Sequence, residues 1–164
     1  MNKTWDRVSL DISFSQLCVF RADLKNPFND WVDEHVEQGF SWRPGSVSFA
    51  ALSDWECDII VSVKNEMQLN DDCVRSIVVP FYVDNEEVAV SSIMSEEYIF
   101  KVPKGVYELS FHATPLEVSE EDGLFRVRYE LIFIKSDLPK PRILIADDEL
   151  KPPKEFLMHT NAAL

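Results

Sequence analysis

Apolar and polar residues alternate along most of this chain, which is the pattern of β-strands that bury one face. In the run Val8–Phe14 every even-numbered residue is apolar. We therefore expect Phe14 to point inward with Val8, and the strand to continue past a bend into LCVFRA (17–22). The further alternating runs are SVSFAAL (46–52), CDIIVSV (57–63), SIVVPFYV (76–83), 88–90, 98–102, 107–113 and 125–135.

Polar turn sequences separate these runs. They are Asn70-Asp71-Asp72, Asp84-Asn85, Pro103-Lys104-Gly105 and Glu121-Asp122-Gly123. About eight short strands with one apolar face each predict a mainly all-β protein, a two-layer antiparallel β-sandwich. Pro80 predicts an edge strand or a bulge, because proline cannot donate a hydrogen bond within a sheet.

The stretch DWVDEHVEQGF (30–40) has a helical spacing instead, and it predicts one short amphipathic helix. Asn26 before Pro27 is the expected N-cap, and Gly39 is the expected end of the helix. At 3.6 residues per turn, one face carries four carboxylates and the opposite face is expected to pack on the sandwich. The carboxylates are Asp30, Asp33, Glu34 and Glu37, and the packing residues are Trp31, Val32, His35 and Val36.

The pattern of residues changes near residue 135, which predicts that the chain has two parts. Residues 1–135 are expected to form the β-sandwich domain. Residues 136–164 are rich in proline and have no sustained period. We expect them to form a C-terminal extension with one added strand at RILIA (142–146), followed by a tail.

Charge limits the classes of partner. The chain has 29 acidic and 16 basic residues, a formal net charge of −13. Proteins that bind nucleic acids directly need lysine and arginine to displace counterions, so direct nucleic-acid binding is disfavoured. Anionic membrane surfaces are disfavoured for the same reason, and no stretch has the roughly 18 apolar residues of a membrane span. A basic protein partner would be attracted.

No pattern for catalysis or metal binding stands out. His35, His112 and His159 lack zinc-ligand spacing, and the sequence has no nucleophile elbow, phosphate-binding loop or dinucleotide fingerprint. His112 alternates with polar residues, so we expect it on the surface. The acidic turns 70–72 and 147–149 lack the spacing of a calcium loop. We therefore expect no enzyme, no metal site and no cofactor.

The cysteines point to the cellular setting. Cys18, Cys57 and Cys73 are widely spaced and odd in number, and the N-terminus lacks a secretory signal pattern. Small core residues in a reducing cytoplasm are the expected interpretation.

The carboxylates of the helix allow two interpretations: a solvated face, or a surface for docking a partner. Trp42 and Arg43 follow the helix, and such residues are enriched as anchors at protein interfaces. Under the second interpretation, the candidate partner-binding residues are Asp30, Asp33, Glu34, Glu37 and Trp42. A second acidic cluster, Glu117, Glu120, Glu121 and Asp122, could extend this surface.

Three segments resemble a known family. They are VFRADLKNPFNDWVDEHVEQGFSWRPGSVSF (19–49), VVPFYV (78–83) and SIMSEEYIFKVPKGVYEL (92–109). Their order and spacing are similar to those of the competence protein J family, whose best-known member inhibits a bacterial DNA-entry nuclease. The resemblance extends from about Trp5 to about Lys135. It implies a protein that binds and blocks a DNA-degrading enzyme, and it transfers no individual functional residue.

The resemblance and the charge lead to one hypothesis: an acidic protein inhibitor that covers the basic DNA-binding cleft of a nuclease. The alternatives left open are a β-sandwich module that binds a carbohydrate or calcium, and an immunity or adaptor protein for another basic partner. The tryptophans and tyrosines and the acidic loops permit the first alternative, although core packing explains most of the tryptophans.

Overall fold

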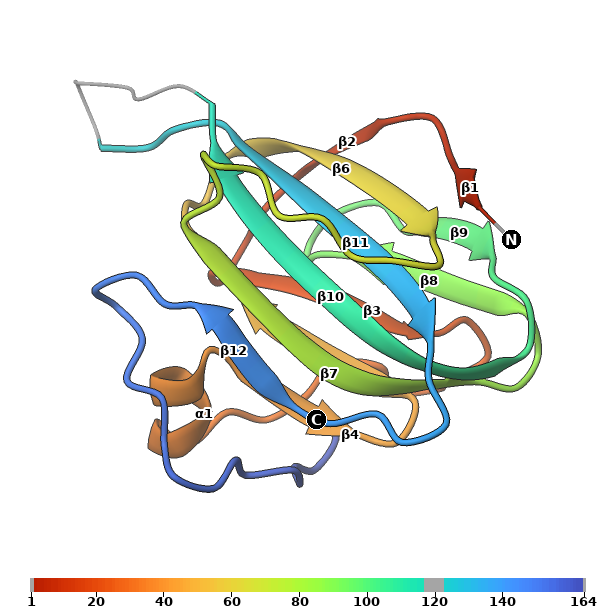
Figure 1. The fold of residues 1–164 in the computed structure, drawn as a ribbon. Helices are drawn as coiled ribbons and strands as arrows, with labels where there is room; N and C mark the ends of the chain where they lie inside the picture. Colours follow the sequence, from red (N-terminus) through yellow and green to blue (C-terminus); the bar gives the residue numbers. More distant parts are fainter. Residues whose placement is uncertain (1, 117–122, 164) are drawn as a thin grey trace.

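Twelve strands and one short helix make up the described part of the chain, residues 2–116 and 123–163 of a computed structural model. Figure 1 shows the strands stacked in two layers, with helix α1 and the C-terminal segment at one end. The strands are β1 (Lys3–Thr4), β2 (Val8–Asp11), β3 (Gln16–Arg21), β4 (Phe40–Arg43), β5 (Ser46–Ala50), β6 (Glu56–Val63), β7 (Arg75–Val83), β8 (Glu87–Ser91), β9 (Tyr98–Lys101), β10 (Gly105–Pro115), β11 (Val127–Lys135) and β12 (Arg142–Ile145), and the helix is α1 (Asp33–Gln38).

The two layers are separate sheets, which confirms the predicted β-sandwich. The first sheet has the order β1-β6-β11-β10-β7-β12, with β2 also pairing with β6, and the second has the order β4-β5-β3-β8-β9. Every pairing is antiparallel except that of β6 with β11, which is parallel. The prediction of an antiparallel sandwich therefore misses one central parallel pair, which alternation within single strands cannot reveal.

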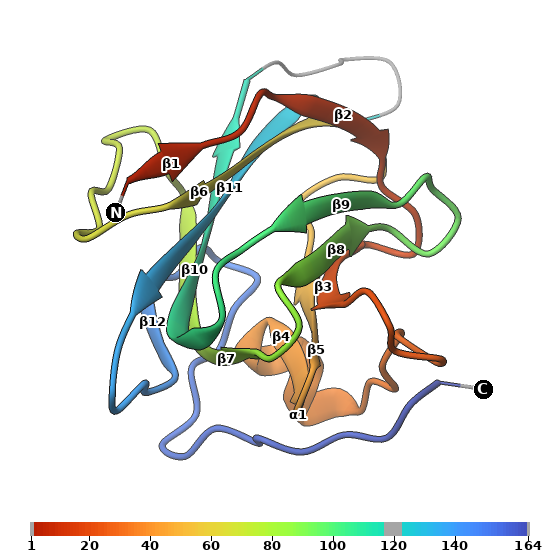
Figure 2. The ribbon, with the colours of Figure 1, turned by 90° about the vertical axis from the view of Figure 1, so that its right-hand side faces the viewer.

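The core fills the space between the sheets. The rings of Phe49 on β5 and Phe111 on β10 stack with their centroids 4.5 Å apart, and Tyr129 on β11 stacks on Phe111 at 5.5 Å. Burying an aromatic side chain contributes several kcal/mol at about 25 cal/mol per Å². This contact joins β5 of the second sheet to β10 and β11 of the first. Figure 2 shows the two sheets as separate layers.

The chain changes sheet between β2 and β3. The turn at residues 12–15 ends β2 in the first sheet and begins β3 in the second. Phe14 and Ser15 both have a positive φ, 54° and 55°. The prediction that Phe14 points inward was wrong: its side chain is 65% exposed. Alternation continued through Phe14, but the backbone leaves the strand conformation before it.

The prediction for Pro80 was partly wrong, because β7 lies between β10 and β12 rather than at an edge. However, β12 pairs only with residues 76–78 of β7. Pro80 is outside that stretch, so its missing N–H costs no bond to β12.

The helix is shorter than predicted. It begins at Asp33 with Val32 as N-cap, not after Asn26, and it ends at Gly39, as predicted, with φ of 87°. The predicted packing face was partly wrong: His35 is buried as predicted, but Val32 and Val36 are exposed, and Gln38, which was not assigned to that face, is buried. The sequence pattern missed the burial of Gln38 because backbone groups of another segment hydrogen-bond its side-chain amide.

That segment is the C-terminal extension. Its first part forms the predicted strand, β12, on β7. The following residues lie against α1 and β4 in both views rather than projecting as a tail (Figures 1 and 2). Leu150 is buried, and Phe156 and Met158 pack on the core. The expected acidic cluster at Glu117, Glu120, Glu121 and Asp122 lies outside the described residues.

Candidate functional site: the acidic helix and its supports

The four candidate carboxylates lie on and just before α1, at one end of the sandwich (Figure 1). Asp33, Glu34 and Glu37 are on α1, and Asp30 precedes it; all four are exposed. Asp33 and Glu37 are four residues apart and therefore neighbours on the helix surface. Within the described chain, none of the four forms an ion pair or a side-chain hydrogen bond. Their charges are available to a partner.

The C-terminal extension anchors this helix through hydrogen bonds to the side chains of Gln38 and His35. Gln38 is buried, and its side-chain amide donates to Leu157 O at 3.0 Å and accepts from Leu157 N at 2.9 Å. His35 Nδ1 accepts the N–H of Val32 at 3.0 Å, which caps the helix, and Nε2 lies 2.9 Å from His159 O. Because His35 Nδ1 is an acceptor, Nε2–H is the donor to the carbonyl. These bonds fix α1, and thus its carboxylates, to the extension.

The backbone at Asp30 is fixed in the same way. Its N–H donates to Asn161 O at 2.9 Å, and its carbonyl accepts from the hydroxyls of Ser41 and Thr160, each at 2.6 Å. Asp30 is therefore exposed at its side chain but anchored at its main chain. Sequence reasoning found the acids but missed this support, because it comes from residues about 130 positions away along the chain.

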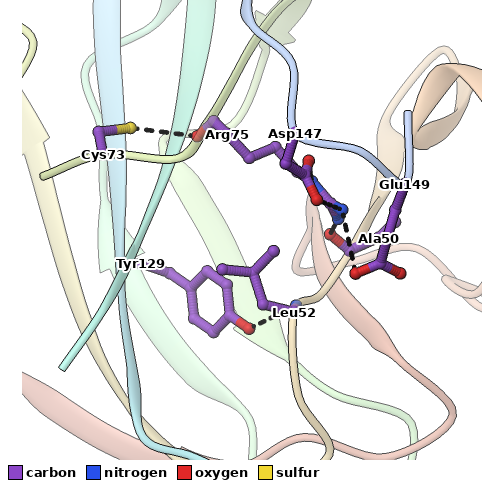
Figure 3. A network of polar contacts seen from close by, with 7 residues as sticks. All are labelled: Ala50, Leu52, Cys73, Arg75, Tyr129, Asp147 and Glu149. Atoms are coloured by element: carbon purple, nitrogen blue, oxygen red, sulfur yellow. Dashed lines mark hydrogen bonds and ion pairs between the residues drawn. The ribbon is translucent and has the colours of Figure 1, made fainter. Parts of the chain in front are cut away.

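A buried arginine joins the extension to both sheets (Figure 3). The Arg75 side chain on β7 is 1% exposed. It donates to both carboxylate oxygens of Asp147 at 2.7 and 2.8 Å and to Ala50 O at 2.8 Å. Burial alone would raise the pKa of Asp147, but the hydrogen bond and charge of Arg75 outweigh it, and the pKa is lowered. Asp147, in the acidic turn 147–149, is therefore one partner of a structural ion pair.

The structure places Trp42 in the core, where it is only 9% exposed. Its indole N–H donates to Pro80 O at 2.7 Å, joining β4 to β7. The candidate anchor therefore holds the two sheets together, and its side chain does not belong to the exposed acidic surface. Aromatic type and position beside a charged helix did not distinguish an interface anchor from a core residue.

His112 is also placed differently from the prediction. It is buried rather than on the surface, with Nε2 2.6 Å from Ser110 Oγ. The loop between β6 and β7 lies over this face of the sheet in Figure 1, and Ser110 also contacts Met67 of that loop. Burial lowers the pKa of His112. A serine beside a histidine is sealed here under a loop, so the pair lacks the access that a catalytic nucleophile needs.

The remaining candidate chemistry is structural. Cys18, Cys57 and Cys73 are free and buried, as predicted. Burial raises the pKa of Cys18 and of Cys57 to about 12, which suppresses the reactive thiolate. Among residues 2–116 and 123–163, no three histidine, cysteine, aspartate or glutamate side chains gather closely enough to hold a metal ion. Within these same residues, no helix is long and apolar enough to cross a bilayer.

Comparison with known proteins gives this acidic surface a context. The sequence profile of the competence protein J (ComJ) family matches residues 9–134. The chain belongs to the competence protein J family. This confirms the resemblance seen in the sequence, and the matched residues include α1, all strands from β3 to β10, and most of β2 and β11.

One sequence match and one structural match are both to proteins from Bacillus subtilis. The DNA-entry nuclease inhibitor of strain 168 is 33% identical over 120 residues, which is 73% of this chain and 90% of that protein. The crystal structure of ComJ, described as an inhibitor of the DNA-degrading activity of NucA, superimposes with a TM-score of 0.69 at 30% identity. The superposition covers 82% of this chain and 99% of that chain. The extension after residue 134 lies outside the match to the ComJ family profile.

Proposed function

We propose that this protein binds a DNA-degrading nuclease of the DNA-entry type and inhibits it by covering its basic DNA-binding cleft with an acidic surface. This extends to the present chain what the matched Bacillus subtilis sequence and structure are named for: inhibition of a DNA-entry nuclease and of the DNA-degrading activity of NucA. The observation that supports the mechanism is the set of exposed, unpaired carboxylates on and before α1. The three free cysteines fit a protein that acts in the reducing cytoplasm.

The mechanism follows from charge. A nuclease cleft that holds a phosphate backbone is positively charged, and carboxylates can occupy the positions of the phosphates. The net charge of −13 attracts such a cleft over long range and accelerates association at low salt. Carboxylates also give the nuclease no phosphodiester bond to cleave. On this proposal the protein itself performs no chemistry, and its fold serves to hold acids in place.

The rigid support of α1 suits this role. Binding is tighter when the contact groups are already ordered, because less conformational entropy is lost on association. Gln38, His35 and the main chain of Asp30 provide that order through the extension. The extension therefore contributes to inhibition indirectly, by holding the helix that carries the acids.

The test compares two charge-reversal variants of equal net charge. Asp33→Lys with Glu37→Lys changes the acidic face of α1, whereas Glu66→Lys with Asp137→Lys changes two exposed acids in the β6–β7 and β11–β12 loops. Association with the purified nuclease is measured by surface plasmon resonance at several salt concentrations. The α1 variant should associate about tenfold or more slowly and with a flatter salt dependence than the loop variant. Equal rates for both would remove α1 from the contact.

A further inference from the structure

The turn that moves the chain from β2 to β3 presents an unusual side chain to solvent. Phe14 has φ of 54° and is 65% exposed. A bulky residue at positive φ is strained, and an exposed phenyl ring gains nothing from the core. Asparagine or glycine would fit this backbone better. The turn therefore carries a cost that the fold itself does not require, which is a feature of functional sites.

Other apolar side chains are exposed around this turn. A hollow of about 230 Å³ lies between the turn and the helix, and its lining includes Phe14, Trp31, Val36 and Ala50. Val36 is an exposed residue of α1, and Met94 is 79% exposed. The backbone N–H of Met94 donates to Ser13 Oγ, which attaches this residue to the same turn. Trp55, also exposed, is attached to the turn through its carbonyl, which accepts the N–H of Ile12 at 3.1 Å. We name the exposed or partly exposed apolar side chains around this turn the Phe14 surface: Phe14, Trp31, Val36, Trp55 and Met94.

The rim of the Phe14 surface is acidic. Two further hollows beside the residues just before the turn include Asp11, Asp54, Glu56 and Glu96 in their lining, in addition to Trp55 and Met94. Asp54 also fixes the turn, because its carboxylate accepts the N–H of Ser15 at 2.8 Å. Among the described residues, no lysine or arginine lines any of these three hollows. An apolar centre with an acidic rim matches a basic partner that has an apolar depression.

Two residues in the lining of the hollow beside α1 carry unpaired polar groups. Trp31 Nε1 and Gln16 Oε1 are both buried, and neither has a hydrogen-bond partner within the described chain. Both residues line this hollow. One is a donor and the other an acceptor, and unpaired buried groups of this kind are unfavourable. A partner main chain entering the hollow carries both an acceptor and a donor, so small side-chain rotations would let one peptide group pair with each.

We propose that the Phe14 surface is the anchor by which this protein docks on the nuclease, with Phe14 inserted into an apolar depression beside the basic cleft. The inference rests on the proposed function and specifies its contact. The carboxylates of α1 attract and orient the nuclease, while the Phe14 surface supplies the close-packed centre that slows dissociation. This division explains why a costly phenylalanine occupies the turn next to the acidic helix.

The test uses the full-length protein with Phe14→Asn, which suits the backbone at positive φ, and with Leu138→Asn as the control. Leu138 is 79% exposed, and its loop between β11 and β12 lies on the opposite side of the molecule from the β2–β3 turn in both views (Figures 1 and 2). Binding to the nuclease and inhibition of plasmid degradation are measured for each protein, and folding is checked by urea denaturation. Phe14→Asn should unfold at the same or higher urea concentration and bind about tenfold or more weakly, mainly through faster dissociation. Leu138→Asn should bind like the wild type.

The outcomes separate the two proposals. If the wild type inhibits the nuclease and folded Phe14→Asn inhibits it equally well, the anchor assignment is overturned and the proposed function stands. If the wild type does not inhibit, the proposed function fails and the docking partner named here fails with it. A second variant, Val36→Ser on the exposed face of α1, replaces Phe14→Asn in the comparison should the latter lose stability, and the same weakening is expected.

Discussion

Replacing Asp147 by asparagine should destabilise the protein, because it removes the counter-charge of a buried arginine. The asparagine keeps the size of the side chain and one acceptor oxygen. It replaces the other oxygen, 2.8 Å from Arg75 Nη2, with an amide that is itself a donor. Arg75 remains 1% exposed, so solvent cannot take the place of the lost carboxylate.

The magnitude follows from this geometry. Removing one partner of a buried ion pair costs about 3–5 kcal/mol. Asp147 is 20% exposed, and Glu149 stands 3.8 Å from the same guanidinium as a weak substitute. Both features reduce the cost, so we expect the lower end, about 3 kcal/mol. For a chain of this length, that corresponds to a fall of about 6–12 °C in Tm.

Urea denaturation at neutral pH measures this free energy, with Asp148→Asn as the control because Asp148 is an exposed neighbour. The difference between Asp147→Asn and wild type should also shrink in acid. The folded-state pKa of Asp147 is lowered, so its stabilisation is present above about pH 3.9 and disappears as the pH falls through the folded pKa. A loss below about 1 kcal/mol at neutral pH, or a difference that does not depend on acid, would refute the assigned role of the pair.

Three further perturbations test other parts of the structure. By urea denaturation, Gly39→Ala should cost about 1–2 kcal/mol for its φ of 87° plus about 1–3 kcal/mol for overpacking, since its Cβ would lie 2.8 Å from Leu150 Cδ2. Gly123 has φ of 75° and its Cβ would meet no atom within 4 Å, so Gly123→Ala should show only the backbone cost in the same measurement. Burial lowers the pKa of His112, so stability should fall as the pH drops below about 6.5, and His112→Gln should flatten that fall in the same measurement across pH. Cys18 and Cys57 should resist a thiol reagent in the native protein and react on unfolding, as followed by absorbance; rapid native labelling of Cys57 would contradict its burial.

Local periodicity was sufficient for the sandwich. Alternating side chains identified nearly every long strand, because burial of one face imposes a period of two residues. The same rule failed at Phe14, where the backbone turns at positive φ, and at His112, where a loop covers the outer face. Both errors concern which residues solvent reaches, and that depends on segments that are distant in the sequence.

At the candidate site, too, the sequence predicted some features and could not predict others. The four acids of the α1 region were predictable as exposed, because like charges without partners stay in water. Burial of Gln38 was not, since its two hydrogen bonds to Leu157 cross 119 positions of sequence. Trp42 is of a residue type that often anchors interfaces, but its indole N–H donates to Pro80 O within the core. Composition identifies candidate contact residues; tertiary hydrogen bonds decide which of them are free to make contact.

Competition with DNA tests the account most directly. Plasmid degradation by a purified DNA-entry-type nuclease is followed at a fixed concentration of this protein while the DNA concentration is raised. If the acidic surface occupies the DNA-binding cleft, inhibition should be strong at low DNA and should be overcome as DNA increases, with a higher apparent inhibition constant at each step. Inhibition that stays constant at every DNA concentration, or no inhibition at all, would contradict the claim that this protein takes the place of DNA.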